Sequence, residues 1–253
     1  MSIIRIRDLQ KSYGNNQVLR GIDLEVEAGQ IIGYIGPNGA GKSTTIRILA
    51  GLDGSFTGEV EVLGYDVKKD PLEVKRRIGY IPEAAEIYEV LTPTEFYELV
   101  GGLQDMPNDL ILKRARRLED ILQLTYDGSQ RIDTFSKGMK QKVLLISGLL
   151  QDPELIFLDE PLAGLDANSV IRVKELLQQL TGRGKTIFYS SHIMEVVEKI
   201  SDRIILLNDG RIAANGTFAE INARLKSGSL ENLFSELTGG TDGTTDFDFT
   251  ADE

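Results

Sequence analysis

The chain has 253 residues, of which 28 are basic and 39 are acidic, so its formal net charge is −11. A chain this acidic is a poor nonspecific binder of nucleic acid or of an anionic membrane surface, and we expect no nucleic acid partner. It contains no cysteine, which excludes disulfides, thiolate metal sites and a cysteine nucleophile and suits a reducing cytoplasm. The hydrophobic share of 41% is typical of a globular protein with one compact domain, or with one domain and an inserted lobe.

Short β-prone segments open the chain, at residues 3–6, 22–26 and 31–35. They are separated by turn-prone stretches that contain Gly14 and Gly29. The second segment alternates apolar and polar residues, which predicts a half-buried antiparallel strand. The third is an almost continuous apolar run, as expected for a central strand of a parallel sheet that is covered on both faces. We therefore expect an antiparallel β subdomain followed by an α/β core.

Between residues 84 and 150 the apolar residues recur at helical spacing, with no convincing strand. We interpret this part as a helical lobe inserted into the α/β core. Its candidate helices lie at residues 94–103, 108–124 and 137–150. After the lobe the parallel sheet is expected to resume, because strand candidates alternate with helix candidates. The strand candidates are residues 155–158, 186–190 and 203–207, and the helix candidates are residues 170–180 and 193–200.

The folded domain is expected to cover residues 1–227, with residues 228–253 forming a tail. From residue 239 onward the tail is rich in Gly, Thr and Asp and has five acidic residues and no basic one, so we predict disorder there. The charged N-terminus lacks the apolar core of a secretory signal. No apolar run approaches the roughly 18 to 20 residues that a bilayer span needs. Any membrane role therefore requires a partner.

The motif that carries most information lies at residues 36–43, which fit G-x-x-x-x-G-K-[ST] between a strand candidate and a predicted helix at 42–52. Its glycines let successive backbone N–H groups face phosphate oxygens, and the helix N-terminus adds partial positive charge. Lys42 can reach the β- and γ-phosphates, and Ser43 can place its hydroxyl on Mg²⁺. A chance glycine-rich turn is the alternative, which the strand–helix context disfavours. The predicted nucleotide-binding residues are Gly36, Pro37, Asn38, Gly39, Ala40, Gly41, Lys42, Ser43 and Thr44.

Residues 155–160 form a hydrophobic strand candidate that ends in two carboxylates, Asp159 and Glu160. Consecutive strand residues point to opposite sides, so we assign the two acids different tasks. Asp159 is the candidate for holding Mg²⁺ through its water shell, and Glu160 is the candidate general base for an attacking water. The alternative is a pair of solvated acids at a strand end. Together with the phosphate loop, the pair indicates a phosphate-loop NTPase.

Three further elements narrow the class: Phe-Ser-Lys-Gly-Met at residues 135–139, Gly-Leu-Asp at 164–166 and Ser-His at 191–192. With the two motifs above, they resemble the ATPase subunit of an ATP-binding cassette (ABC) transporter over roughly residues 3–223. The sequence Phe-Ser-Lys-Gly-Met-Lys-Gln at 135–141 resembles the variant of exporter-type cassettes. The resemblance implies an α/β fold: a phosphate-loop NTPase core with a parallel sheet, an N-terminal antiparallel β subdomain and an inserted helical lobe.

In that family the Ser-x-Gly signature caps the γ-phosphate that is bound at the phosphate loop of the other subunit in a dimer. Ser136 and Gly138 match it, whereas Phe135, Lys137 and Met139 replace the common Leu, Gly and Gln. By itself Ser136 would be an ordinary helix N-cap. The two roles are compatible, because capping leaves backbone N–H groups facing an anion.

Three single residues are assigned by the same resemblance. His192 matches the family's switch histidine, which would contact the γ-phosphate near Glu160; an ordinary surface or core histidine is the alternative. Tyr13 matches the aromatic residue that stacks on adenine, the alternative being an ordinary strand-end tyrosine. Glu83 stands where the family commonly has a Gln that touches Mg²⁺ or the attacking water and relays the site's state to the membrane subunit. It could instead be a solvated loop acid.

We therefore expect an ATP-binding and ATP-hydrolysing subunit, with ATP and Mg²⁺, that powers transport, in the direction of export. It would act with a second ABC subunit, as a homodimer or with a similar chain, and with integral membrane permease subunits. Its place would be cytoplasmic, peripheral on the inner face of the cell membrane. The rival hypothesis is a soluble ABC ATPase that serves as a switch or scaffold; no long coiled-coil insertion or second cassette supports it. A GTPase or small-molecule kinase lacks support because no Asn-Lys-x-Asp motif is present.

Overall fold

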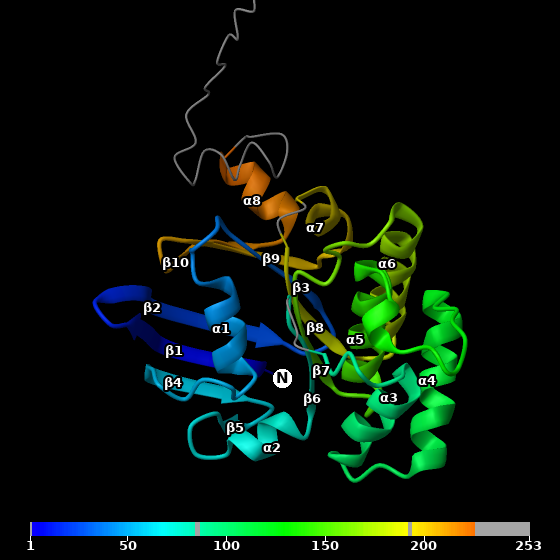
Figure 1. Ribbon diagram of the computed structural model, residues 1–253. Coiled ribbons are helices and arrows are strands. Elements are labelled where there is room, and N and C mark those ends of the chain that lie inside the picture. Colours follow the sequence, from blue (N-terminus) through cyan, green and yellow to red (C-terminus); the bar gives the residue numbers. More distant parts are fainter. Residues whose placement is uncertain (1, 84–86, 192–193, 226–253) are drawn as a thin grey trace, which may run out of the picture.

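The computed structural model describes residues 2–83, 87–191 and 194–225, which form two sheets and surrounding helices (Figure 1). The predicted tail at 228–253 and the domain end at 227 lie outside the described residues, as does His192. No helix within the described ranges combines the length and apolarity that a membrane span requires. The helices are α1 (Lys42–Leu49), α2 (Pro71–Lys75), α3 (Pro93–Gly102), α4 (Asn108–Leu122), α5 (Lys137–Leu149), α6 (Ala167–Thr181), α7 (Met194–Ile200) and α8 (Phe218–Leu225).

The N-terminal sheet is antiparallel, in the order β2-β1-β4-β5. Its strands are β1 (Ser2–Tyr13), β2 (Asn16–Glu27), β4 (Thr57–Val62) and β5 (Tyr65–Asp66). The first two are much longer than the apolar segments at 3–6 and 22–26. Both strands continue through polar residues. Register irregularities, including a left-handed Asp8 (φ 44°), also interrupt the alternation of apolar and polar residues by which strands are predicted from sequence.

The second sheet has six strands in the order β10-β9-β3-β8-β7-β6, and all neighbours are parallel except β10 and β9. Its strands are β3 (Ile31–Ile35), β6 (Ile78–Ile81), β7 (Leu155–Asp159), β8 (Thr186–Ser190), β9 (Arg203–Asn208) and β10 (Arg211–Gly216). The predicted strands at 31–35 and 186–190 are found with the expected bounds. The parallel sheet therefore resumes after the helical part, as predicted.

Both faces of the six-stranded sheet are buried, and alternate residues serve two separate cores. On β7, Leu155 and Phe157 join the core made with α1 and the antiparallel sheet, whereas Ile156 and Leu158 join the core beneath α3 to α7. Figure 1 shows α3 to α6 on one side of this sheet and α1 with the antiparallel sheet on the other. This double burial explains why the β7 sequence is continuously apolar.

The helical lobe has α3, α4 and α5, with a short 3₁₀ turn, η1 (Ile132–Thr134), before α5. Thr92 and Glu95 form a reciprocal capping box at the start of α3, with Pro93 at its first position. Helix α4 ends at Leu122 rather than 124, because Gln123 takes a left-handed conformation with φ 48°. Asp166 caps α6, which starts three residues before the predicted 170.

Candidate functional site

An open pocket of about 620 Å³ lies where the loop between β3 and α1 meets the end of β7. It gathers residues that are more than 140 positions apart in the sequence. Its lining is Asn16, Val18, Asn38, Gly39, Gly41, Lys42, Ser43, Thr44, Glu83, Asp159 and Glu160. Six residues of the predicted phosphate loop, both predicted carboxylates and Glu83 therefore face one space, whereas Gly36, Pro37 and Ala40 do not line it. The chain order of β3, loop and α1 is the strand–loop–helix context that the motif requires.

The backbone of the loop depends on its glycines. Gly39 and Gly41 have φ values of 81° and 107°, which side chains of L-residues rarely adopt. A Cβ at Gly41 would lie 2.5 Å from Cδ2 of Leu19, and one at Gly36 would lie 2.3 Å from the carbonyl oxygen of Leu207. No side chain caps the N-terminus of α1, which starts directly after Gly41. The first N–H groups of this helix are therefore available to an anion in the pocket.

Lys42 is the cation of the pocket, and it is buried. Its Nζ donates to the carbonyl oxygens of Gly36 at 2.8 Å and Pro37 at 3.2 Å. Burial lowers the pKa of the Lys42 ammonium, and the nearby carboxylates of Glu160, Asp159 and Glu83 partly oppose that shift. The ammonium is thus held inside the loop. Because it is partly removed from water there, its charge would attract an incoming phosphate more strongly than at the surface.

Asp159 and Glu160 are both buried, and Ser190 connects them. The Ser190 hydroxyl donates to Oδ1 of Asp159 at 2.5 Å and accepts the backbone N–H of Glu160 at 3.1 Å. Glu160 lies just beyond the end of β7 and takes a left-handed conformation with φ 49°. Strand alternation therefore does not separate the two acids as the sequence argument assumed, since Glu160 is outside the strand. Both carboxylates line the same pocket.

The donor set fits a magnesium ion that is shared with a nucleotide. Ser43 and Asp159 line the pocket beside the loop, and Mg²⁺ in such sites is usually held by one or two protein oxygens plus phosphates and water. Among the described residues, no group of three or more His, Asp or Glu side chains is placed to hold a metal ion by itself. The pocket thus suits a metal that arrives with phosphate.

Ser136 and Gly138 are not among the residues that line this pocket. Ser136 is exposed, and its hydroxyl caps α5 by accepting the backbone N–H of Met139 at 3.2 Å. A Cβ at Gly138 would lie 3.0 Å from the carbonyl oxygen of Gly164, so the start of α5 packs closely against the loop before α6. The helix-cap role of Ser136 is therefore present within one chain, whereas a phosphate contact by Ser136 stays a prediction.

Tyr13 also lies outside the lining of the pocket, at the end of β1, with 49% of its surface exposed. Its hydroxyl donates to Oδ2 of Asp53 at 3.1 Å. The ammonium of Lys11, which is buried, lies 4.6 Å from the centre of the Tyr13 ring and donates to Oδ1 of Asp53 at 2.9 Å. One side of the ring is thereby occupied, and stacking on adenine stays a prediction.

Sequence reasoning missed several residues at the site. Asn16 and Val18 line the pocket but sit in no recognisable motif. Ser190 could have been inferred, because it ends the predicted strand at 186–190 and the carboxyl ends of parallel strands meet at one edge of the sheet. Its partner across the β7–β8 ladder is Asp159.

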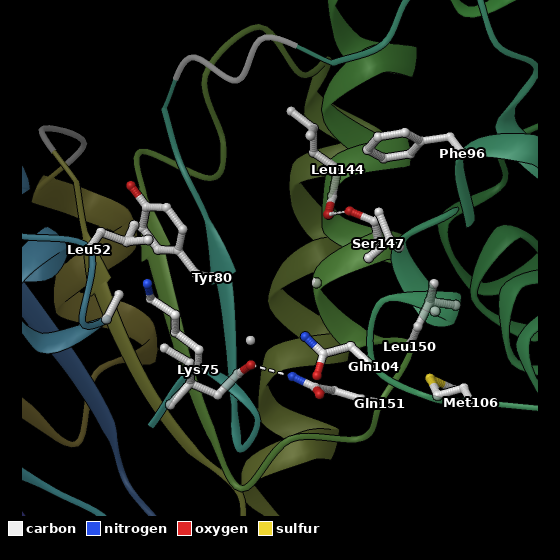
Figure 2. A pocket seen from close by; sticks show the side chains of 16 residues that line it. Leu52, Lys75, Tyr80, Phe96, Gln104, Met106, Leu144, Ser147, Leu150 and Gln151 are labelled. Carbon is white, nitrogen blue, oxygen red and sulfur yellow. Dashed lines mark hydrogen bonds between the residues drawn. The ribbon is translucent and has the colours of Figure 1, made fainter. Parts of the chain in front are cut away.

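A second pocket, of about 290 Å³, lies between β6 and the helical lobe (Figure 2). Figure 2 shows Leu52 and Tyr80 on one side of it, opposite Phe96 and Leu144 of α3 and α5. Gln151 donates to the carbonyl oxygen of Ile78 at its lower end. Burial raises the pKa of the Tyr80 hydroxyl, and the charge of Asp159 adds to this effect. Tyr80 is three residues before Glu83, so the edge strand β6 connects the two pockets.

Comparison with known proteins agrees with this geometry. A family model described as "ABC transporter" matches residues 19–163. The linearmycin resistance ATP-binding protein LnrL of Bacillus subtilis (strain 168) is 34% identical over 231 residues, which are 91% of this chain and 74% of that protein.

Solved structures give the same result for the fold. One described as an ATP-binding subunit of an ABC transporter superposes with a TM-score of 0.86 and 32% identity, and it covers 93% of this chain and 99% of its own. The dimeric cassette MJ0796 in a post-hydrolysis state with ADP and phosphate gives a TM-score of 0.79 at 25% identity, covering 85% of this chain and 98% of its own. The predicted α/β fold class, with an antiparallel β subdomain, a largely parallel core sheet and a helical lobe, is confirmed.

Proposed function

The chain belongs to the ABC transporter family as an ATP-binding subunit that hydrolyses ATP, and from this we propose that it powers export through partner membrane subunits. The observation that carries the proposal is the convergence of Lys42, Asp159 and Glu160 on one pocket beside an uncapped helix N-terminus. Its relative LnrL is named for resistance to linearmycin, which favours export as the direction of transport.

Binding of the triphosphate would rest on the loop. Backbone N–H groups of the loop and of the first turn of α1 would surround the β-phosphate, and Lys42 would move from the carbonyl oxygens of Gly36 and Pro37 to phosphate oxygens. Mg²⁺, held by Ser43 and through Asp159, would supply charge neutralisation on the β- and γ-phosphates. Ser190 would keep the Asp159 carboxylate in place through its hydrogen bond.

Hydrolysis adds water to the γ-phosphorus and breaks its bond to the bridging oxygen, which leaves with ADP. Glu160 would accept the proton of the attacking water, because it is the second buried carboxylate of the pocket and its backbone is held by Ser190. Lys42 would stabilise the negative charge on the transferred group. His192 would contribute a further donor near the γ-phosphate.

Two copies of the chain would complete the sites. The pocket of one chain is open, and Ser136, which does not line it, is exposed at the start of α5. We propose that Ser136 and Gly138 of one chain close the nucleotide pocket of the other. The dimeric arrangement of the related cassette MJ0796 supports this.

Membrane partners would contact the second pocket (Figure 2), which forms a groove between the core and the helical lobe. Leu52 in its lining is 46% exposed, and Leu103, which directly precedes the lining residue Gln104 in the chain, is 77% exposed. Exposed apolar side chains around a groove favour a protein partner. Because β6 links this groove to Glu83, docking there could respond to the state of the nucleotide.

Copurification tests this function against the rival switch or scaffold role. The tagged wild-type chain, purified from gently solubilised membranes, should carry stoichiometric integral membrane subunits. Cells that lack the chain should become more sensitive to at least one antibiotic, and the wild type but not Glu160→Gln should restore resistance. Recovery of the chain only with cytosolic proteins, in cells whose resistance is unchanged by its loss, would favour the scaffold hypothesis.

A further inference from the structure

Helix α4 carries a concentration of positive charge that the proposed function does not use. Lys113, Arg114, Arg116 and Arg117 lie within five consecutive positions of a chain whose net charge is −11. In the part of the chain that the structure describes, none of the four forms an ion pair. Like charges this close on one helix repel each other. Asp109 and Asp120 of the same helix border one hollow together with Lys113, Arg116 and Arg117. On the side that faces α6, Arg114 and Arg117 have no α4 carboxylate beside them, so this side favours an anionic ligand.

Two of these side chains border a groove of about 260 Å³ between α4, the end of α5 and α6. Arg114 and Arg117 line it from α4, and Arg183 lines it from the turn after α6. Arg114 donates to the carbonyl oxygen of Leu150 at 2.7 Å, which fixes its guanidinium at the edge. The apolar part of the lining consists of Leu118, Ile121, Leu149, Leu176 and Leu180.

The groove keeps an excess of positive charge. Asp152 is its one acidic lining residue, and its carboxylate is 2.9 Å from the ammonium of Lys185. Arg117 and Arg183 are exposed and form no ion pair within residues 2–83, 87–191 and 194–225. A suitable ligand would therefore combine carboxylates or similar anions with apolar groups.

We propose that this groove binds the chain's own acidic segment, residues 239–253. That segment contains five acidic residues and no basic one, and its sequence at 246–249 is Asp-Phe-Asp-Phe. In an extended peptide, alternate side chains point to opposite sides. Phe247 and Phe249 would then face the leucine-lined floor, and Asp246 and Asp248 would face the arginines. Rings bury apolar area, and arginine–carboxylate pairs form charge-assisted hydrogen bonds.

The length of the connecting chain permits this contact. About twenty residues separate the end of α8 at Leu225 from Asp246, and fully extended they would span roughly 65–70 Å. A domain of this size has a radius of gyration of only about 17 Å. Because the segment is tethered, its effective concentration at the groove is on the order of millimolar, so even weak contacts would be occupied.

Disulfide trapping in the full chain tests the proposal, since the natural sequence has no cysteine. Thr250→Cys places a thiol beside the two rings, and Gln179→Cys places one in the groove. Under mild oxidation this pair should form an intramolecular disulfide at least about fivefold more than a pair of Thr250→Cys with Thr57→Cys, since Thr57 is exposed at the start of β4, outside the groove. Trapping should weaken in 1 M NaCl, where the Debye length is about 3 Å.

Charge reversal identifies the arginines as the contact. Arg117→Glu with Arg183→Glu should lower trapping at least about threefold, whereas Lys113→Glu with Lys174→Glu, on α4 and α6 but outside the groove lining, should have a smaller effect. Equal trapping at Gln179 and Thr57, or cross-linked dimers in place of intramolecular disulfides, would overturn the proposal. So would binding of phosphatidylglycerol vesicles that requires Arg117 and Arg183 while trapping stays at the Thr57 level, because a lipid would then be the ligand.

Discussion

The hydroxyl of Ser190 donates to Oδ1 of Asp159 at 2.5 Å, between the ends of the neighbouring parallel strands β8 and β7. The hydroxyl oxygen of Ser190 also accepts the backbone N–H of Glu160, the proposed general base. One buried serine thus positions the backbone or side chain of both acids. The β8 strand ends one position before Ser191 and two before His192, so it also leads directly to the proposed γ-phosphate contact.

Replacement of Ser190 by alanine should lower MgATP turnover roughly 10- to 100-fold, as is typical when a residue that orients a metal ligand is removed. The apparent Mg²⁺ requirement should rise in parallel, because Asp159 loses its hydrogen bond. Steady-state phosphate release at varied Mg²⁺ measures both effects. The control is Ser201→Ala. In the wild type the Ser201 hydroxyl is hydrogen-bonded to the Tyr189 hydroxyl at 3.1 Å and not to Asp159. Wild-type turnover and Mg²⁺ dependence in Ser190→Ala would contradict the positioning role.

Lys42→Ala should abolish productive MgATP binding, whereas Glu160→Gln should bind MgATP but hydrolyse it very slowly. Lys42 would neutralise phosphate charge in the ground state, while Glu160 would act only when water attacks. Nucleotide binding by calorimetry and single-turnover hydrolysis separate the two effects. Rapid turnover by Glu160→Gln would remove Glu160 as the base.

Asp53→Asn should make the stability of the protein less dependent on acid pH. Burial alone would raise the pKa of Asp53, but hydrogen bonds from Lys11, the Ser55 N–H and Tyr13 lower it. A carboxylate whose folded pKa is depressed stabilises the fold above its unfolded pKa of about 4, and this contribution is lost as the pH falls through the folded value. The melting temperature of Asp53→Asn should therefore lie below that of the wild type at pH 7 and converge with it toward pH 3. A constant difference across this range would contradict the assignment.

Glu83→Gln should change nucleotide affinity by less than about threefold, because Glu83 is exposed and solvent screens its charge. It should instead alter the number of ATP molecules hydrolysed per transport event, since β6 connects Glu83 to the proposed membrane-partner groove. Parallel ATPase and transport measurements in reconstituted vesicles test this. Wild-type rates for both activities would argue that Glu83 is only a solvated loop acid.

Mixing two inactive variants should reveal whether the active site is shared between chains. Lys42→Ala and Ser136→Arg homodimers would each carry two damaged sites, whereas a mixed dimer would collect both lesions in one site and leave the other intact. In a Glu160→Gln background, mixing should therefore trap about one nucleotide per mixed dimer, as expected if each site takes Lys42 and Ser136 from different chains.

Controls with wild-type subunits would establish that chains exchange under the same conditions. If exchange is complete and every mixing ratio still traps no more nucleotide than the separate variants, Ser136 serves only as the N-cap of α5. The cap itself is already explained by its hydrogen bond from Met139. The Ser136→Thr variant, which keeps a capping hydroxyl, should retain the fold in either case.

The sequence alone determined the family, the phosphate loop and the order of the subdomains. These features depend on residues that are close together in the chain: the glycines and Lys42 of residues 36–43 act through local backbone conformation, and the continuous apolar runs at 31–35 and 155–158 follow from burial on both faces of the sheet. The predicted helical lobe rested likewise on local periodicity. Such patterns can be recognised before any long-range contact is known.

The tertiary structure decided which of these residues share one space. The left-handed backbone of Glu160 turns its carboxylate into the pocket of Asp159, and the register of β7 against β8 places Ser190 beside both. It also placed Ser136 and Tyr13 outside the pocket of their own chain. Local spacing does not give these placements, because they depend on contacts between distant segments: β7 and β8 pair across about thirty residues, and β3 and β8 across more than 150.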